Sequence, residues 1–141
     1  MKLRLAIVFI LVIVTLLSFS GCGSNPQIPF ELSCDQFYEE QHHSWDVNAD
    51  VGSSIVVTLC SNPTTGFQWT ESPKNSDSSV LRQKEHEYIS PDTNLTGAAG
   101  KQTWSFEALK KGTTTILFEY SQSWEGGEKS FWTLTANVVV K

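Results

Sequence analysis

Short segments in which apolar and polar residues alternate are the feature that most limits what this chain can fold into. The alternation is clearest at residues 54–60, 102–108, 113–120 and 130–140. Weaker segments of the same kind lie at residues 43–51, 67–70 and 80–89. Because successive side chains of a strand point to opposite faces, each segment has one apolar face to bury. The pattern therefore predicts an all-β chain of about seven short strands.

The intervals between these segments are typical of turns rather than of helices. Gly, Pro, Asn or Asp occurs at residues 50–52, 73–77 and 110–112. No stretch after Cys34 keeps a 3.6-residue period over three turns, and residues 37–42 allow one helical turn at most. We expect an immunoglobulin-like antiparallel β-sandwich, in which the weak 80–89 strand is anchored by Val80, Tyr88 and Ile89.

The first 21 residues have the composition of an export signal. Lys2 and Arg4 precede an apolar run at residues 5–17, which is shorter than the roughly 20 residues of a membrane-spanning helix. The Ser-Gly-Cys that ends at Cys22 resembles the lipobox of bacterial and archaeal lipoproteins, although Phe19 replaces the usual aliphatic residue. The sequence thus predicts a signal peptide at residues 1–21, a lipidated Cys22, a flexible tether at residues 22–33 and a folded domain at residues 34–141.

Such a protein is exported and anchored to the outer face of a prokaryotic membrane, or is secreted if the signal is of the ordinary kind. Two cysteines then remain, Cys34 and Cys60. An exported compartment permits a disulfide between them, and two buried thiols are the alternative. Their separation of 26 residues would make the bond worth about 3–4 kcal/mol in the chain-entropy account.

The charge balance and the missing motifs exclude several function classes. Without residues 1–21 the chain holds 8 Lys or Arg against 15 Asp or Glu, a net charge of −7, which disfavours nucleic-acid binding. No metalloprotease, phosphate-loop or nucleophile-elbow motif occurs in the sequence, and the adjacent His42 and His43 would point to opposite faces of a strand. We therefore expect a protein that is not an enzyme and that carries no metal and no cofactor.

Three of the predicted connections differ from ordinary turns. They are residues 60–66, 90–100 and 121–129. In a sandwich whose strands alternate in direction, these three connections emerge at one end and the plain turns at the other. Immunoglobulin-type domains build binding sites from such a cluster of loops.

Each unusual connection has a chemical character of its own. Pro63 fixes φ and Gly66 permits positive φ, which makes a stiff loop that loses little entropy on binding. Residues 97–100 carry nothing larger than a methyl group, so a partner's backbone can approach them closely. Trp124 stands in a glycine-flanked loop, as expected of a binding hot spot. The plainer interpretations are a rigid turn, a flexible loop and a Trp folded back on the sheet edge.

Three motifs in this order resemble the chagasin-type inhibitors of cysteine peptidases. They are Asn-Pro-Thr-Thr-Gly-Phe-Gln-Trp at residues 62–69, Gly-Ala-Ala-Gly at residues 97–100 and Tyr-Ser-Gln-Ser-Trp-Glu at residues 120–125. The first motif is highly specific, the third is moderately so, and the second is weak by itself. The resemblance covers residues 47–141, nearly all of the predicted domain.

The resemblance implies an immunoglobulin-like fold and reversible inhibition of papain-like cysteine peptidases by a monomer. Thr64 and Thr65 would enter the cleft at the catalytic Cys and His, residues 97–100 would lie along its wall, and Trp124 would pack on the far side. The residues implied as the peptidase-binding set are Asn62, Pro63, Thr64, Thr65, Gly66, Phe67, Gly97, Ala98, Ala99, Gly100, Gln122, Ser123 and Trp124.

One motif departs from the family, and one other function fits the residues. The third motif of the family usually reads Arg-Pro-Trp, whereas this chain has Gln122-Ser123-Trp124. We expect inhibition to survive this change, with weaker binding or an altered target preference. The alternative function is an extracellular adhesion or carbohydrate-binding module in which Trp124 stacks on a sugar face.

Overall fold

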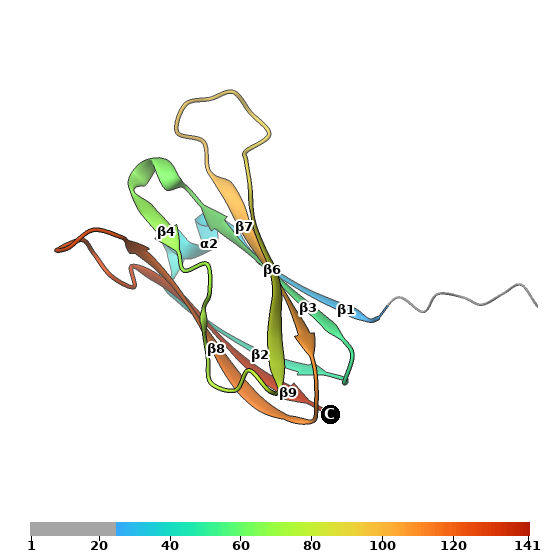
Figure 1. Ribbon diagram of the computed structural model, residues 1–141. Coiled ribbons are helices and arrows are strands. Elements are labelled where there is room, and N and C mark those ends of the chain that lie inside the picture. The colour runs from blue at the N-terminus through green and yellow to red at the C-terminus, as the bar shows by residue number, and fades with distance from the viewer. Residues whose placement is uncertain (1–24) are drawn as a thin grey trace, which may run out of the picture.

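Two β-sheets packed face to face form the structure (Figure 1), a computed structural model that describes residues 25–141. The expected signal peptide and the lipidation site Cys22 lie outside the described residues. The strands are β1 (Gln27–Leu32), β2 (His42–Ala49), β3 (Ser54–Ser61), β4 (Phe67–Trp69), β5 (Lys74–Asn75), β6 (Leu81–Ile89), β7 (Gly100–Ala108), β8 (Gly112–Gln122) and β9 (Trp132–Val140). The helices are α2 (Cys34–Glu39) and the short 3-10 helix η1 (Pro63–Thr65).

The predicted β-sandwich is confirmed, but its sheets are mixed rather than purely antiparallel. One sheet has the strand order β1-β3-β7-β6, and the other has the order β2-β9-β8-β4 with β5 paired to β8. The pairs β1–β3 and β2–β9 are parallel, and all other pairs are antiparallel. β1 and β2, which α2 connects, are each at one edge of a sheet and lie parallel to their neighbours, whereas β6 and β4 at the other edges are antiparallel.

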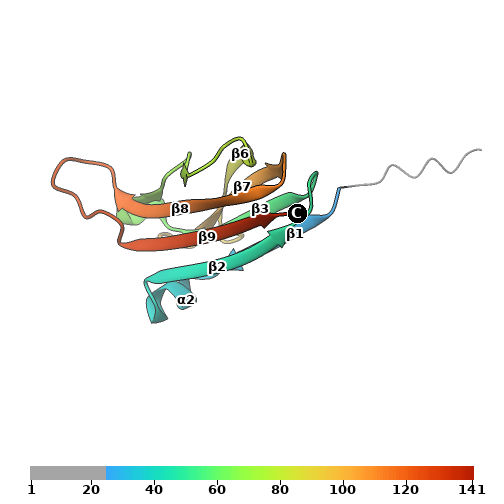
Figure 2. The same ribbon diagram turned by 90° about the horizontal axis from the view of Figure 1, so that it is seen from below.

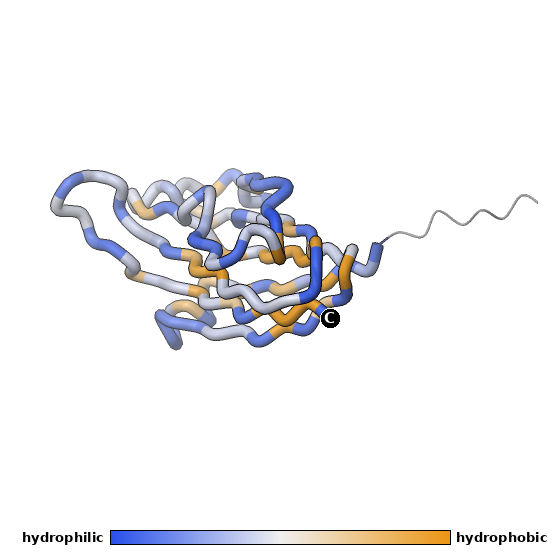
Figure 3. The backbone as a smooth tube through the Cα atoms, turned by 60° about the horizontal axis from the view of Figure 1, so that its bottom comes forward, coloured by the Kyte–Doolittle hydropathy of each residue, from blue (hydrophilic) through white to orange (hydrophobic). Residues whose placement is uncertain are grey.

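The alternation seen in the sequence corresponds to the buried faces of the central strands. The fully buried side chains of these strands include Ile55, Val57, Leu59, Trp104, Phe106, Ile116, Phe118 and Leu134. Figure 3 shows the hydrophobic residues along the strands and hydrophilic residues in the connections.

The expected anchors of the 80–89 strand are partly wrong: Val80 is buried, but Tyr88 and Ile89 are 39% and 46% exposed. β6 is an edge strand, and Leu81 supplies its fully buried side chain.

Half of the predicted tether belongs to the folded domain. Residues 27–32 form β1, which pairs with β3 from Gln27 opposite Ser54 to Leu32 opposite Leu59. Leu32 is buried, and Ile28 and Phe30 pack against the core. Pro29, which lacks an amide hydrogen to donate, is tolerated because β1 lies at the edge of its sheet. The domain therefore begins near residue 27 rather than at Cys34.

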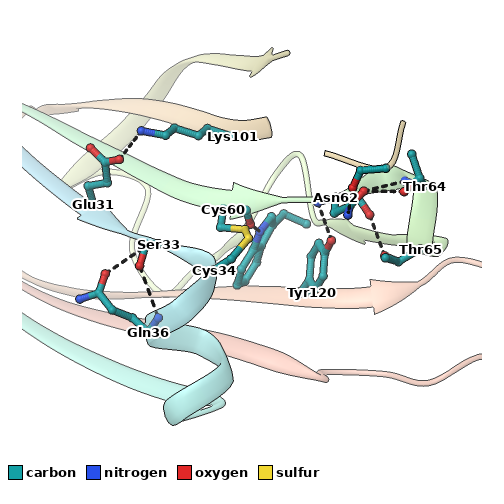
Figure 4. Close-up of a disulfide and its surroundings, with 12 residues drawn as sticks. Glu31, Ser33, Cys34, Gln36, Cys60, Asn62, Thr64, Thr65, Lys101 and Tyr120 are labelled. Carbon is teal, nitrogen blue, oxygen red and sulfur yellow. Dashed lines mark hydrogen bonds and ion pairs between the residues drawn. A yellow bond between two sulfur atoms is a disulfide. The ribbon is translucent and has the colours of Figure 1, made fainter. Parts of the chain in front are cut away.

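The helical turn begins earlier than residues 37–42 and is better anchored than predicted. Ser33 and Gln36 form a capping box: the Ser33 side chain accepts from the Gln36 amide, and the Gln36 side chain accepts from the Ser33 amide at 2.8 Å. Phe37 is fully buried and stacks on Trp132 with ring centroids 4.9 Å apart. The predicted disulfide is confirmed and joins Cys34 of α2 to Cys60 of β3 (Figure 4).

The two ends of the sandwich differ in what they carry. We call the end at which β3 stops and β4 begins the loop end. The described chain starts at the opposite end, because Gln27 pairs with the first residue of β3, and the C-terminus also lies there (Figures 1 and 2). α2 lies at the loop end, where β1 finishes and β2 begins. No helix among residues 25–141 is long and apolar enough to cross a membrane.

Candidate functional site

Three connections meet at the loop end of the sandwich, as the alternation of strand directions predicted. We call residues 62–66 the first loop, residues 90–99 the second loop and residues 123–131 the third loop (Figure 1). The Asn62 side-chain amide donates to the Gly97 carbonyl at 2.9 Å, which joins the first loop to the second. The Trp124 ring lies so close to Gly66 that a Cβ there would stand 2.6 Å from it. The three loops therefore form one connected surface.

The first loop is a closed turn rather than an extended segment. η1 spans Pro63–Thr65, and Gly66 ends it with a φ of 81°, in the left-handed region that favours glycine. The Asn62 side-chain oxygen accepts from the Thr64 amide at 3.3 Å and from the Thr64 hydroxyl at 2.6 Å. The Thr65 hydroxyl donates to the Asn62 carbonyl at 2.7 Å. Thr64 and Thr65 themselves are exposed, so the loop presents two threonines on a fixed turn.

Asn62 connects this turn to the body of the domain. Its backbone amide donates to the Tyr120 hydroxyl at 2.9 Å (Figure 4), while its side-chain amide holds the second loop. Tyr120 is only 2% exposed and stacks on Trp132 with ring centroids 4.9 Å apart. One residue thus fixes the first loop, the second loop and β8 relative to one another. The sequence predicted Tyr120 as a core residue but gave no sign that its hydroxyl supports the site.

Burial raises the pKa of the Tyr120 phenol above its ordinary value of 10.0. The unfolded chain therefore releases this proton at lower pH than the folded chain does. The contribution of Tyr120 to stability is complete below about pH 10 and declines as the pH rises through the raised folded pKa, by up to about 1.4 kcal/mol per pH unit. Urea unfolding of the wild-type protein and of Tyr120→Phe from pH 8 to pH 11 measures this decline in the free energy of unfolding. We expect the variant to show the shallower decline, and parallel profiles would contradict this assignment.

The second loop contains the small residues that the sequence analysis singled out. The Ala98 amide donates to the Leu95 carbonyl at 3.2 Å, and Gly97, inside that turn, has a φ of 81°. Gly97 and Ala99 are exposed, whereas Gly100 is buried as the first residue of β7. A Cβ on Gly100 would stand 2.3 Å from the Ile89 carbonyl oxygen. Gly100 is therefore required for the close approach of β6 and β7, and it lies beneath the surface that the loop presents.

The third loop is held by hydrogen bonds from Gln122. The Gln122 side-chain oxygen accepts from the Glu128 amide at 2.9 Å, and the Gln122 amide donates to the Glu128 carbonyl at 2.8 Å. The Lys129 ammonium donates to the Trp124 carbonyl at 3.1 Å and also to the Gln122 carbonyl. Gln122, which takes the place of the Arg in the Arg-Pro-Trp motif, thus restrains a loop that lacks the proline. Ser123 is exposed, and Trp124 is half exposed.

Phe67 is the other predicted contact residue that lies beneath the loops. Its ring stacks on Tyr120 at 5.5 Å between centroids and tilts against Phe131 at 4.9 Å.

Among residues 25–141 no group of three or more His, Cys, Asp or Glu side chains could hold a metal ion. Since the three loops contact one another, the loop end presents a preformed surface that can bind another molecule.

The comparisons with known proteins agree with this geometry. Residues 48–138 match the family described as Chagasin family peptidase inhibitor I42. Chagasin of Trypanosoma cruzi is 33% identical over 91 residues, which cover 60% of this chain and 79% of the relative. Amoebiasin-2 of Entamoeba histolytica is 29% identical over 120 residues, which cover 79% of this chain and 95% of the relative.

Two solved structures share the fold. The cysteine protease inhibitor EhICP2 from Entamoeba histolytica superimposes with a TM-score of 0.62 at 22% identity, covering 84% of this chain and 100% of its own. PbICP-C, solved in complex with falcipain-2, superimposes with a TM-score of 0.58 at 14% identity, covering 83% of this chain and 100% of its own. At these identities the two structures support the sandwich architecture.

Proposed function

The chain belongs to the chagasin family of peptidase inhibitors, and on this premise we propose how it inhibits papain-like cysteine peptidases: the three loops occlude the active-site cleft together. The observation that carries the proposal is the pair of contacts that lock the loops, from Asn62 to Gly97 and from Gly66 to Trp124. A surface that is ordered before binding loses little conformational entropy when a partner binds it. Such loops suit a tight and reversible inhibitor.

Thr64 and Thr65 have the role of the residues that enter the cleft. They are exposed on η1, in a loop that contacts the second loop through Asn62 and the third loop through Gly66. A peptide bond is cleaved when it lies extended against the nucleophile. The first loop cannot extend without breaking the hydrogen bonds that its threonines make with Asn62. It therefore fills the cleft without offering a bond that the peptidase can cut.

Replacing Thr64 and Thr65 together by alanine is expected to weaken inhibition of papain at least about tenfold, since each lost contact is worth about 1 kcal/mol. The change removes the two hydroxyls that fix the loop through Asn62, at the positions assigned to enter the cleft. Inhibition constants from steady-state assays give the effect, with circular dichroism as the check on folding. The matched control is Thr64→Ser with Thr65→Ser, which keeps both hydroxyls and should retain most of the potency. Full potency of the folded alanine variant would contradict the role of the first loop.

Trp124 and the second loop supply the flanking contacts. The six-membered ring of Trp124 lies against Gly66, and half of the side chain remains exposed to a partner. A half-exposed Trp that packs beside a polar turn is a typical hot spot of a protein interface. The alternative of a carbohydrate-binding module draws no support from this arrangement, because part of the ring that a sugar would cover is already in contact with the first loop.

We also propose that the protein is exported and that a lipid on Cys22 anchors it, with residues 22–26 as the tether. The described chain begins at the end of the sandwich opposite the loops (Figure 1), so the anchor and the inhibitory surface do not compete for space. The eight residues of β3 separate the two ends by roughly 26 Å. Mass spectrometry of the mature protein should find an acylated Cys22 at its N-terminus. An unmodified N-terminus at another residue would contradict the anchor.

A further inference from the structure

A small pocket opens beside the first loop, between that loop and α2. Its volume is about 180 Å3, and Tyr38, Asn62, Thr65, Phe67, Phe131 and Trp132 are among its lining residues. Asn62 and Thr65 belong to the first loop, and Phe131 belongs to the third. The pocket therefore adjoins the first and third loops. The sheet supplies Phe67, Tyr120 and Trp132, and α2 supplies Tyr38. α2 lies outside the residues 48–138 that match the family.

α2 holds Tyr38 in a position that packing alone does not explain. The helix is fixed by the disulfide at Cys34, by the buried Phe37 and by the capping box at Ser33. Tyr38 is nevertheless 72% exposed, and its ring meets Trp132 in a T-shaped contact at 5.3 Å between centroids. An aromatic side chain that a fixed helix leaves exposed next to a binding surface has the character of an anchor for a partner.

The charges of α2, which supplies Tyr38 to the pocket, indicate which side chain the pocket suits. Residues 31–41 include the exposed acids Asp35, Glu39 and Glu40 and contain no Lys or Arg. Aromatic rings that line a pocket accept the aliphatic stem of a long side chain, and they attract a cation above their faces. Carboxylates on the same helix favour that cation further and repel an acidic side chain. A basic side chain therefore satisfies both the walls and the charge.

We propose that α2 and its pocket form a fourth contact with the target peptidase and receive a Lys or Arg side chain from the rim of the cleft. The inference rests on the proposed function, because the pocket adjoins the surface that enters the cleft. It assigns Tyr38 a role in target preference: peptidases with a basic residue at this point of the rim are inhibited more strongly than those with an acidic one. The carboxylates of α2 attract a basic side chain on the rim and repel an acidic one, and this difference is the physical basis of the preference.

The test uses the papain-like peptidase that the wild-type protein inhibits most strongly in a panel. Tyr38→Ala should raise the inhibition constant about tenfold, whereas Tyr38→Phe, which keeps the ring, should stay within about twofold. Glu39→Gln with Glu40→Gln should also raise it, more at low than at high ionic strength, because salt screens exposed charges. The control is Val51→Ala, which removes a half-exposed apolar side chain at the opposite end and should change nothing. Thermal unfolding of each variant monitors the fold.

The outcomes separate this inference from the function itself. An unchanged inhibition constant for a folded Tyr38→Ala variant would overturn the fourth contact while wild-type inhibition remained. If Tyr38→Ala inhibited more weakly but the glutamine variant inhibited as well as the wild type at every ionic strength, the pocket would not receive a basic side chain. A wild-type protein that inhibits no member of the panel would instead refute the proposed function.

Discussion

Replacing Cys34 and Cys60 together by alanine is expected to lower the free energy of unfolding by about 3–4 kcal/mol. The disulfide closes a loop with a sequence separation of 26 residues, and the estimate follows from the chain entropy that it removes from the unfolded state. For a domain of this size the loss corresponds to a fall of the melting temperature by roughly 15 °C. Urea unfolding and thermal scans under oxidising conditions measure both quantities.

Reduction provides the internal control for this prediction. The reduced wild-type protein should unfold with nearly the same free energy as the alanine variant, and the reductant should leave the variant itself unchanged. A stability loss below about 1 kcal/mol would contradict a structural role for the bond. The variant should also inhibit less well, because Cys60 directly precedes the strand end that carries the first loop, and Cys34 fixes α2 beside it.

Gly66→Ala should have the largest effect on inhibition, an increase of the inhibition constant on the order of a hundredfold. Gly66 has a φ of 81°, which costs a residue with a Cβ about 1–2 kcal/mol. The new methyl group would stand 2.6 Å from the Trp124 ring and must displace it. Since an interface Trp contributes about 2 kcal/mol or more, and each 1.4 kcal/mol is a factor of ten, distortion of both loops gives this magnitude.

Gly52→Ala is the matched control for the backbone strain. Gly52 has a φ of 87°, but a Cβ there would meet no atom within 4 Å, and it lies in the turn between β2 and β3 at the opposite end. Both variants should lose stability, Gly66→Ala the more because its methyl group also meets Trp124, whereas Gly66→Ala alone should lose inhibition. If both variants inhibited as well as the wild type, the contact between Gly66 and Trp124 would have no part in the inhibitory surface.

Local signals in the sequence were sufficient for the central strands and for the three loops. The alternation at residues 102–108 and 113–120 predicted the buried faces of β7 and β8, because a sheet in a sandwich buries one face of each strand. Pro63 and Gly66 predicted a stiff turn, and their fixed backbone angles are the reason for it. The direction of successive strands then sufficed to place all three loops at one end.

The elements before residue 42 could not be predicted in the same way. β1 is short and contains Pro29, and its pairing with β3 is a long-range contact that no local pattern encodes. The capping box at Ser33 and Gln36 was the available sign of α2, but a six-residue helix is stable here only because Phe37 is buried and Cys34 is bonded. The support that Tyr120 gives to Asn62 likewise depends on tertiary packing.

The central claim is that the domain blocks a papain-like active site with loops that are not cut. Steady-state inhibition of papain by the purified protein tests it most directly, together with the recovery of the inhibitor after the complex dissociates. We expect dose-dependent inhibition that raises KM and leaves kcat unchanged, with the recovered chain intact across residues 62–66. Full papain activity in the presence of excess folded protein, or cleavage within the first loop, would contradict the account.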